Sequence, residues 1–308
     1  MKKKVSILDS IGNTPLIELN SIYIKLEHLN PSGSIKDRIA KYIIEKAEIS
    51  GMLKKGMYIV EATSGNTGIA FSLVTSVKGY KMIVVMPKGL TNERTKMILA
   101  LGAKLVLVKE NCVSCAIKKT HEISRRLNTY LPGQFENEWN IEENEKILGR
   151  EILKQLKGKK INAFVAGVGT GGSLIGIGKA LKKRFPDIKI IAMEPYECQL
   201  LSGNGYRHHK IHELHTKICH KHEIEGIGDG FIPGIIKRNR SLIDDVITIK
   251  TSDAIDATKE LAHKGYFVGI SSGANYLAAL RLKQKYNNVI TLFPDRGDRY
   301  LTLLYKNK

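Results

Sequence analysis

Short runs of apolar residues alternate along this chain with amphipathic segments, and a glycine-rich turn often joins the two. The stretches MYIVEATSGNTGIAFSLVTSVKGYKMIVVMP and INAFVAGVGTGGSLIGIGKALKKRFPDIKIIAMEP are two copies of this plan. Strand, helix and strand in this order are typical of parallel βαβ units. The expected strands end near Ala62 or cover residues 82–86, 104–110, 163–166, 189–193, 265–270 and 288–294, with helices over 67–77 and after Gly172. The pattern predicts an α/β protein with its functional groups at the carboxyl ends of the strands.

The stretch NPSGSIKDRIAKYIIEKAEI, residues 30–49, predicts a turn followed by a helix. Ser34 is expected to cap this helix, and Asp37 to return the hydrogen bond as a capping box. The apolar side of the helix is formed by Ile35, Ile39 and Ile43. Lys36 then lies in the first helical turn, where unpaired N–H groups and the positive end of the helix dipole favour a neutral amine over an ammonium. Lys36 is therefore a candidate reactive amine.

A length of 308 residues exceeds the usual size of one hydrophobic core, so we expect one large or two smaller domains. No proline- or serine-rich linker separates two halves of the chain. With two domains, the chain is expected to cross between them near Lys36 and again near Gln134, which makes one lobe discontinuous. Residues 38–138 would then form a smaller, mobile lobe, and residues 1–37 plus 139–308 a larger one.

No window approaches the roughly 20 apolar residues of a membrane helix, and the N-terminal stretch lacks the pattern of a secretion signal. We therefore expect a cytoplasmic protein with no membrane partner. The formal net charge of +19 raises the question of nucleic acid. Basic residues recur through every expected helix, however, without an aromatic-interleaved basic motif or zinc-finger spacing. We interpret the excess as solvated surface that steers anionic small molecules, and expect no nucleic-acid partner.

The four cysteines form no regular framework, which fits a reducing compartment and predicts reduced, structural thiols. Cys112 and Cys115 form a CxxC where a strand gives way to a helix, and redox or metal duty is the alternative there. A histidine-rich run raises the possibility of a metal site. It shows no closed set of ligands, so no functional metal is expected there. That run contains His208, His209, His212, His215, Cys219, His220 and His222.

Two glycine-rich loops follow expected strands. AGVGTGGSLIG fits neither a dinucleotide fingerprint nor a P-loop, and its backbone N–H groups before a helix predict a cup for a monophosphate. The alternative is a tight turn that needs small residues for packing. ATSGNTG adds hydroxyl and amide donors, which suit a carboxylate; the alternative is a helix cap by Ser64 or Thr67. A lysine with a lowered pKa, a loop suited to a phosphate and a loop suited to a carboxylate together indicate pyridoxal 5'-phosphate with an amino-acid substrate.

The motifs NPSGSIKDR, TSGNTG, GVGTGGS, EGIGDGFIP and GISSGAN, in this order, resemble the family of cysteine synthases (O-acetylserine sulfhydrylases) and cystathionine β-synthases. The likeness runs from IGNTPLIEL to DRGDRYL. It implies a pyridoxal-phosphate enzyme of fold type II, with two lobes that each hold a twisted, mostly parallel sheet flanked by helices. It also implies a homodimer that acts on small-molecule amino acids at their β-carbon.

The resemblance implies roles for single residues. Lys36 would form the Schiff base with the cofactor and later remove the substrate α-proton. Asn66 would donate a hydrogen bond to the cofactor's ring oxygen. Ser271, with Ser272 as the fallback, would face the pyridine nitrogen. The alternative is that both serines cap a helix. The substrate carboxylate would be held by Thr63, Ser64, Thr67 and Gln134. The phosphate would be held by Gly169, Thr170, Gly171, Gly172 and Ser173.

Asp229 departs from the family pattern, because cysteine synthases usually carry alanine there and cystathionine synthases often tyrosine. A carboxylate facing the β-carbon can act as a general base toward water and repels hydrosulfide. Our hypothesis is that L-cysteine loses hydrogen sulfide and the resulting α-aminoacrylate is hydrated to L-serine, or releases pyruvate if hydration fails. The alternatives are a solvated loop aspartate, a plain cysteine synthase and a minimal cystathionine β-synthase. Two alternatives outside the enzymes are a non-catalytic binding partner and a nucleic-acid-binding protein.

Two further stretches bear on the site. QFENEWNIEENEKILGREI, from Gln134 onward, departs from the family pattern and weakens the assignment of a leaving group such as acetate. In FPDRGDRYL, Asp295 follows a strand and lies at the level of the cofactor, where it can face the pyridine ring. We prefer the expectation that Asp295 pairs with Arg296 or Arg299 at the boundary between the lobes.

Overall fold

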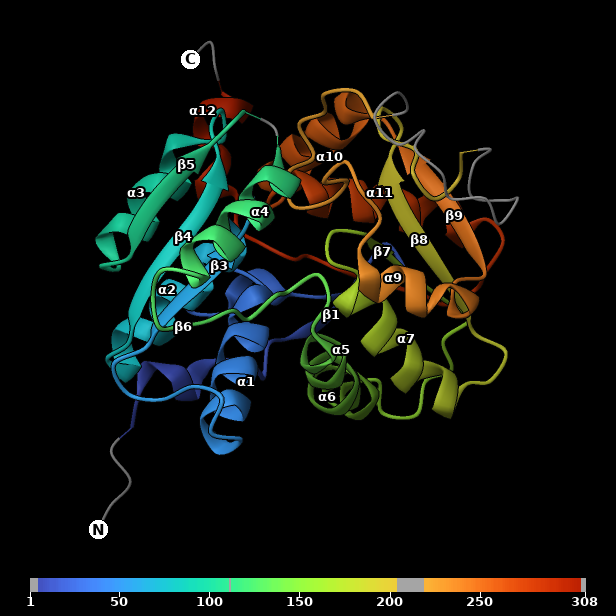
Figure 1. Ribbon diagram of the computed structural model, residues 1–308. Helices are drawn as coiled ribbons and strands as arrows, with labels where there is room; N and C mark the ends of the chain where they lie inside the picture. The colour runs from blue at the N-terminus through green and yellow to red at the C-terminus, as the bar shows by residue number, and fades with distance from the viewer. Residues whose placement is uncertain (1–4, 111, 204–218, 306–308) are drawn as a thin grey trace.

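The computed structural model describes residues 5–110, 112–203 and 219–305, and its chain forms two sheets that stand side by side (Figure 1). A six-stranded sheet has the order β1-β2-β10-β7-β8-β9, and a four-stranded sheet has the order β5-β4-β3-β6. All neighbouring strands are parallel except β1 and β2. The predicted fold class, two mostly parallel sheets flanked by helices, is confirmed.

The strands of the larger sheet are β1 (Leu16–Leu19), β2 (Ile22–Lys25), β7 (Ala163–Gly167), β8 (Lys189–Pro195), β9 (Asp245–Ile249) and β10 (Val289–Leu292). Those of the smaller sheet are β3 (Tyr58–Ala62), β4 (Lys81–Pro87), β5 (Lys104–Val108) and β6 (Thr129–Tyr130). The α-helices are α1 (Lys36–Ile49), α2 (Asn66–Lys78), α3 (Asn92–Ala100), α4 (Val113–Ser124), α5 (Glu138–Glu143), α6 (Gly149–Gln155), α7 (Gly172–Arg184), α9 (Gly234–Arg238), α10 (Thr251–His263), α11 (Ile270–Lys283) and α12 (Leu301–Leu304). A π-helical turn, η3 (Asn144–Leu148), joins α5 to α6.

Both faces of each sheet are covered, as the near-continuous apolar strands require. In the smaller sheet, Ile59 and Val84 pack with α1, α2 and α3, whereas Val60 and Val85 pack with α4 on the opposite face. In the larger sheet, one face packs on α6 and α7 and the other on α10 and α11. Alternate residues of one strand thus belong to different cores, because successive side chains point to opposite faces.

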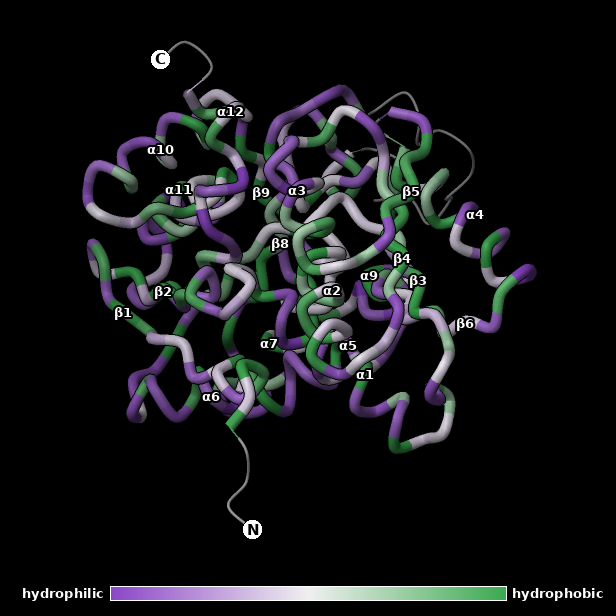
Figure 2. Tube along the Cα trace, turned by 90° about the vertical axis from the view of Figure 1, so that its left-hand side faces the viewer, coloured by the Kyte–Doolittle hydropathy of each residue, from purple (hydrophilic) through white to green (hydrophobic). Residues whose placement is uncertain are grey.

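The described polar positions are spread over the outer loops and helices, without a single concentration in the view of Figure 2. Among the described residues, no helix is both long and apolar enough to cross a membrane.

Most of the expected elements are present, including the strands expected within 104–110 and 288–294. The strand expected over residues 265–270 is wrong. Val268 makes only an isolated bridge to Arg296, and Ile270 already begins α11. Val268 and Ile270 are buried in the core beside α10 and α11, so their apolar character reflects packing of a turn rather than pairing with a strand.

The capping box expected from Ser34 and Asp37 is also wrong. The backbone N–H of Lys36 donates to the Ser34 hydroxyl at 3.3 Å, but the Asp37 carboxylate turns back to the Ser32 hydroxyl and to the Ser32 N–H, the latter at 2.6 Å. Asp37 therefore closes the turn that precedes α1 instead of capping the helix.

The prediction of reduced thiols is wrong for all four cysteines, which form the disulfides Cys112–Cys115 and Cys198–Cys219. Cys112 is the N-cap residue of α4, so Cys115 lies one turn later with its Cα 5.2 Å away. Cys198 and Cys219 form an isolated antiparallel bridge that brings their Cα atoms to 4.0 Å. The Cα separation of Cys112 and Cys115 lies in the usual range for a disulfide. Spacing along the chain does not reveal that Cys198 and Cys219 meet.

Candidate active site

A cavity of about 60 Å³ lies where the carboxyl ends of β3, β7 and β10 and the start of α1 meet. It is lined by all the site residues expected from the sequence except Gly172 and Ser272, the fallback for Ser271. A wider pocket of about 470 Å³ adjoins it. Both are lined by Ser64, Glu225, Gly226, Ile227 and Asp229. Loops after parallel strands converge on one edge of a sheet, which explains how segments far apart in sequence reach one cavity.

Lys36 begins α1 and faces the cavity. Burial lowers the pKa of its ammonium below the usual value, and the carboxylates of Asp295 and Asp229 oppose that shift. A lowered pKa increases the share of neutral amine, which is the nucleophilic form. The reactive lysine predicted from the sequence thus has a suitable environment, although desolvation rather than the helix end is the main physical cause.

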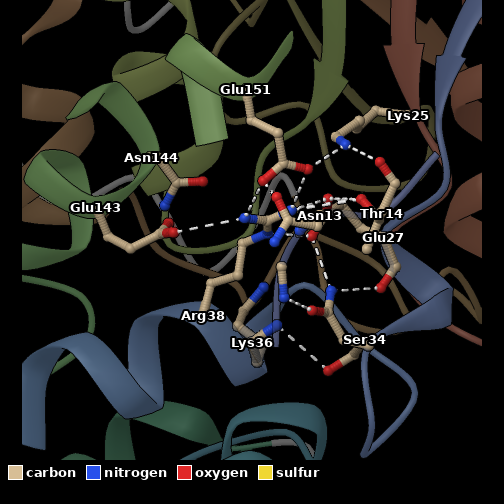
Figure 3. Close-up of polar contacts among 12 residues, drawn as sticks. Asn13, Thr14, Lys25, Glu27, Ser34, Lys36, Arg38, Glu143, Asn144 and Glu151 are labelled. Carbon is tan, nitrogen blue, oxygen red and sulfur yellow. Dashed lines mark hydrogen bonds and ion pairs between the residues drawn. The ribbon is translucent and has the colours of Figure 1, made fainter. Parts of the chain in front are cut away.

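A buried network of charges fixes the first turn of α1 directly behind Lys36 (Figure 3). The Arg38 guanidinium donates to both carboxylate oxygens of Glu27, at 2.6 and 2.8 Å, and to Glu151 at 3.0 Å. Glu151 also pairs with Lys25, and Glu143 lies 3.9 Å from Arg38. These groups come from β2, α1, α5 and α6 and the turn after β2, so the network ties the start of α1 to the larger sheet and its helices.

Asp295 does not pair with Arg296 or Arg299, which corrects our preferred expectation. Its carboxylate accepts hydrogen bonds from the Asn66 amide at 2.6 Å and the Tyr300 hydroxyl at 2.5 Å. Arg299 instead donates to the Asn66 carbonyl oxygen at 2.6 Å. The Asn66 side chain is therefore held at both ends, and its amide nitrogen keeps a second proton for another acceptor.

The loop after β3 brings hydroxyl and amide groups to the cavity. Thr63 accepts the Gly65 N–H at 2.8 Å, and Thr67 donates to the Gln134 carbonyl oxygen at 2.6 Å. Gln134 in turn donates to the Ala62 carbonyl at 2.7 Å. The alternative of a helix cap by Ser64 or Thr67 is wrong, because the N-cap of α2 is Gly65 and no side chain caps it. The cluster therefore offers polar groups to a ligand from two loops.

The glycine-rich loop after β7 leads into α7. A side chain at Gly169 would overlap the Gly226 carbonyl, and one at Gly171, whose φ is +87°, would overlap Ile236. Gly172 packs against Asn140 and donates its N–H to the Thr170 hydroxyl at 3.3 Å. Packing thus requires these glycines, as our alternative stated. The first N–H groups of a helix have no intrahelical partners, so the same loop also offers donors to an anion.

Ser271 lies in the first turn of α11 and lines the cavity, whereas Ser272 does not line it. The N-cap of α11 is Gly269, without a side-chain bond, so the alternative of a serine cap is wrong. Ser271 is thus the serine placed to meet a group bound in the cavity.

Asp229 lines both the cavity and the outer pocket. Burial raises the pKa of its carboxyl, while electrostatic interactions with His222 and Lys36 and a hydrogen bond from the Ser64 hydroxyl oppose that shift. His222 donates from Nε2 to the Gly228 carbonyl at 3.0 Å. Its raised pKa makes this carboxylate a stronger base than that of an exposed aspartate.

Sequence reasoning missed an ion pair between Arg94 of α3 and Glu225, which precedes Asp229 in the same loop. Arg94 is 1% exposed, stacks 4.6 Å from the centre of the Tyr300 ring and donates to Thr91 at 3.1 Å. Its aliphatic stem covers Gly65 so closely that no side chain fits there. The run NERTKMILA contains no local sign of this contact, because the partners are distant in sequence.

Of the histidine-rich run, residues 208–218 lie outside the described residues, and with them His208, His209, His212 and His215. Among the residues that the structure does describe, no group of three or more histidine, cysteine or acidic side chains is arranged to hold a metal ion.

A family model, curated proteins and solved structures resemble this chain over most of its length. Residues 7–295 match the family model described as pyridoxal-phosphate dependent enzyme. The cysteine synthase of Staphylococcus aureus is 41% identical over 310 residues, which cover 96% of this chain and 95% of that protein. A hydrogen sulfide-producing enzyme from Fusobacterium nucleatum is 40% identical, with a TM-score of 0.88 over 97% of this chain and 90% of that one. A variant of the latter enzyme with one aspartate changed to asparagine was solved with an α-aminoacrylate intermediate, at 39% identity, a TM-score of 0.89 and 97% and 91% coverage.

Proposed function

Because this chain belongs to the family of pyridoxal-phosphate-dependent enzymes, we propose that it converts L-cysteine and water into L-serine and hydrogen sulfide. The coarser activity, substitution or elimination at the β-carbon of amino acids, is that of the cysteine synthase group to which its relatives belong. The specific proposal rests on one observation: Asp229 lines the cavity beside Lys36 and Ser64.

The residues around the cavity fit the cofactor by their chemistry. Lys36 would hold its aldehyde, Ser271 would face the pyridine nitrogen, and the free proton on the Asn66 amide would reach the ring oxygen. The phosphate would bind the N–H groups at the start of α7, within the loop of Gly169, Thr170, Gly171, Gly172 and Ser173. When bound, pyridoxal phosphate holds the substrate's amino group and makes its α-proton and β-substituent labile.

The substrate carboxylate would bind between the loop after β3 and Gln134, through Thr63, Ser64 and Thr67. Lys36, released as a neutral amine, would accept the α-proton of L-cysteine, and the β-sulfur would leave as hydrosulfide. Asp229 would then accept a proton from water as the water oxygen bonds to the β-carbon, and Lys36 would return its proton to the α-carbon. The proton on Asp229 passes to hydrosulfide, so one water enters and one hydrogen sulfide leaves.

Two features favour water over a sulfur nucleophile at this step. A carboxylate at the cavity mouth repels hydrosulfide by like charge, whereas neutral water is not repelled. The sulfide-producing relative in which an aspartate was changed to asparagine, solved with an intermediate bound, supports the assignment of the step after sulfide release to a carboxylate.

A second candidate is cysteine synthesis from O-acetylserine and sulfide, which the name of the Staphylococcus aureus relative favours. It would use the same cavity and the same Lys36. It assigns no chemical task to Asp229, so the two candidates differ in the effect of changing this residue.

The test compares L-cysteine turnover by the wild-type holoenzyme with that of Asp229→Asn, which keeps the shape of the side chain. We expect serine formation to fall by about 100-fold or more, the usual effect of losing a general base. Asp256→Asn, at an exposed position on α10, is the matched control and should turn over cysteine normally. Lys36→Ala should abolish turnover. Unchanged serine formation by Asp229→Asn, or pyruvate as the sole product of the wild type, would refute the proposal.

A further inference from the structure

The outer pocket adjoins the inner cavity, since five residues line both spaces. One cysteine of each disulfide lines this pocket, Cys112 in one and Cys219 in the other. His220 and Lys221 line the same pocket, as do the carboxylates of Asp229 and Glu225, the latter paired with Arg94. On the proposed function, hydrosulfide released in the cavity enters this adjoining pocket, and hydrosulfide is a good nucleophile toward disulfides.

The Cys112–Cys115 disulfide lies at the N-terminus of α4, a helix of 12 residues. Cys112 lines the pocket, whereas Cys115 belongs to the first turn of the helix and does not line it. An attack from the pocket therefore meets the Cys112 sulfur and expels Cys115. The helix N-terminus stabilises the departing Cys115 thiolate, which makes it a good leaving group.

We infer that this disulfide is a second reactive site, which accepts the hydrosulfide that the enzyme releases and stores it as a persulfide on Cys112. The inference rests on the proposed function for the source of sulfide. The hydrosulfide sulfur bonds to the Cys112 sulfur as the Cys112–Cys115 bond breaks. Cys115 leaves as a thiolate with the bonding electrons, and the incoming sulfur is oxidised from sulfide to the persulfide level. Attack of Cys115 on Cys112 reverses the step and returns hydrosulfide.

The second disulfide is an internal control. Cys219 also faces the pocket, but its partner Cys198 is 0% exposed and belongs to the apolar core under α6 and α7. A thiolate expelled into that core would be unsolvated, so Cys198 is a poor leaving group. Persulfide should therefore form on Cys112 and not on Cys219.

The test traps persulfides with an alkylating reagent and maps them by mass spectrometry after either of two treatments of the oxidised holoenzyme. In the first, sodium sulfide is added directly; in the second, L-cysteine is the only sulfur source. We expect the Cys112 peptide to carry one additional sulfur, in at least about tenfold excess over the Cys219 peptide. The variant Cys115→Ser leaves Cys112 without a disulfide to open, and its Cys112 peptide should carry none.

The two treatments separate the two claims. Persulfide on Cys112 with added sulfide but not with L-cysteine supports the site and contradicts the proposed source of sulfide. Release of sulfide from L-cysteine without labelling of Cys112 in either treatment overturns the inference and leaves the proposed function intact. Equal labelling of Cys112 and Cys219, or labelling of Cys112 in Cys115→Ser, also overturns it.

Discussion

Glu61 is a buried acid directly beneath the loop that presents Gln134 to the cavity. It is 3% exposed and accepts the Ala62 N–H at 3.0 Å. Burial raises its pKa to about 8, while hydrogen bonds from backbone groups, those of Gly133 and Gln134 included, oppose the shift. The carboxyl is thus neutral in the folded protein at pH values where the unfolded chain has already lost the proton.

This difference predicts a pH dependence of stability. Between the ordinary value of 4.5 and about 8, the folded state binds more protons than the unfolded state, so Glu61 lowers stability as the pH rises through that window. Glu61→Gln lacks this penalty, and its stability relative to wild type should increase by on the order of 3 kcal/mol between pH 5 and pH 8. Urea unfolding at both pH values measures it, with the exposed Glu260→Gln as the control. A relative stability independent of pH would contradict the assignment.

Lys36, Asn66, Asp229 and Ser271 could be singled out from the sequence because each lies in a short motif, and the structure places all four around one cavity. Their chemical roles remain predictions. Glu61 could not be found in this way, since an acid at the end of a strand shows no sign of burial. Asp295 was assigned the wrong partners, because the arginines beside it in sequence turn toward Asp298 and only folding brings Asn66 and Tyr300 to it.

At the scale of elements, the ion pair of Arg94 and Glu225 joins α3 beside the smaller sheet to the loop that carries Asp229. Side chains of Arg94 and Glu225 are 1% and 12% exposed. A buried pair is costly to break because it leaves one charge without a partner. We therefore expect the pair to hold the loop in the position that presents Asp229 to the cavity.

The prediction is that Arg94→Met lowers stability by roughly 3 kcal/mol and shifts the products of L-cysteine from serine toward pyruvate. The double variant Arg94→Met with Glu225→Gln removes the unpaired charge and should regain stability but not the serine share. Unfolding curves and the serine-to-pyruvate ratio are the two readouts. A double variant with the wild-type product ratio would show that the pair has no positioning role.

The strands and helices were largely predictable, because apolar runs and glycine-rich turns alternate clearly along β3 to β4 and β7 to β8. The prediction of a strand over 265–270 failed because a short buried turn and a short strand have the same apolar pattern. The prediction of reduced thiols failed for Cys198 and Cys219 because the two are 21 residues apart in sequence and meet only through an isolated bridge.

At the scale of the whole molecule, the network of Arg38, Glu27, Glu151 and Lys25 connects α1 with the larger sheet and the helices below it (Figure 3). Burial raises the pKa of nearby Glu143 to about 8, in spite of Arg38. The smaller lobe of residues 38–138, its mobility and a homodimeric assembly remain predictions. The network lies at the first expected crossing between lobes, so it would anchor the point about which such a lobe moves.

Loss of the Arg38 charge should therefore be far more damaging than loss of a surface charge. Arg38→Met leaves Glu27, which is 0% exposed, without its partner, and we expect a loss of roughly 3 to 5 kcal/mol. Arg238→Met, at a site 45% exposed and also paired with two glutamates, should lose less than about 1 kcal/mol. Urea unfolding of both variants measures the difference. Equal losses would mean that the buried network does not stabilise the fold.

The central claim is that water replaces sulfur at the β-carbon of L-cysteine. The most direct measurement is turnover of L-cysteine by the wild-type holoenzyme in water enriched in oxygen-18, with serine and sulfide quantified together by mass spectrometry. The account predicts serine that carries one heavy oxygen in its hydroxyl group, formed in equal amount to sulfide. Sulfide accompanied only by pyruvate and ammonia, or no turnover of L-cysteine at all, would contradict it.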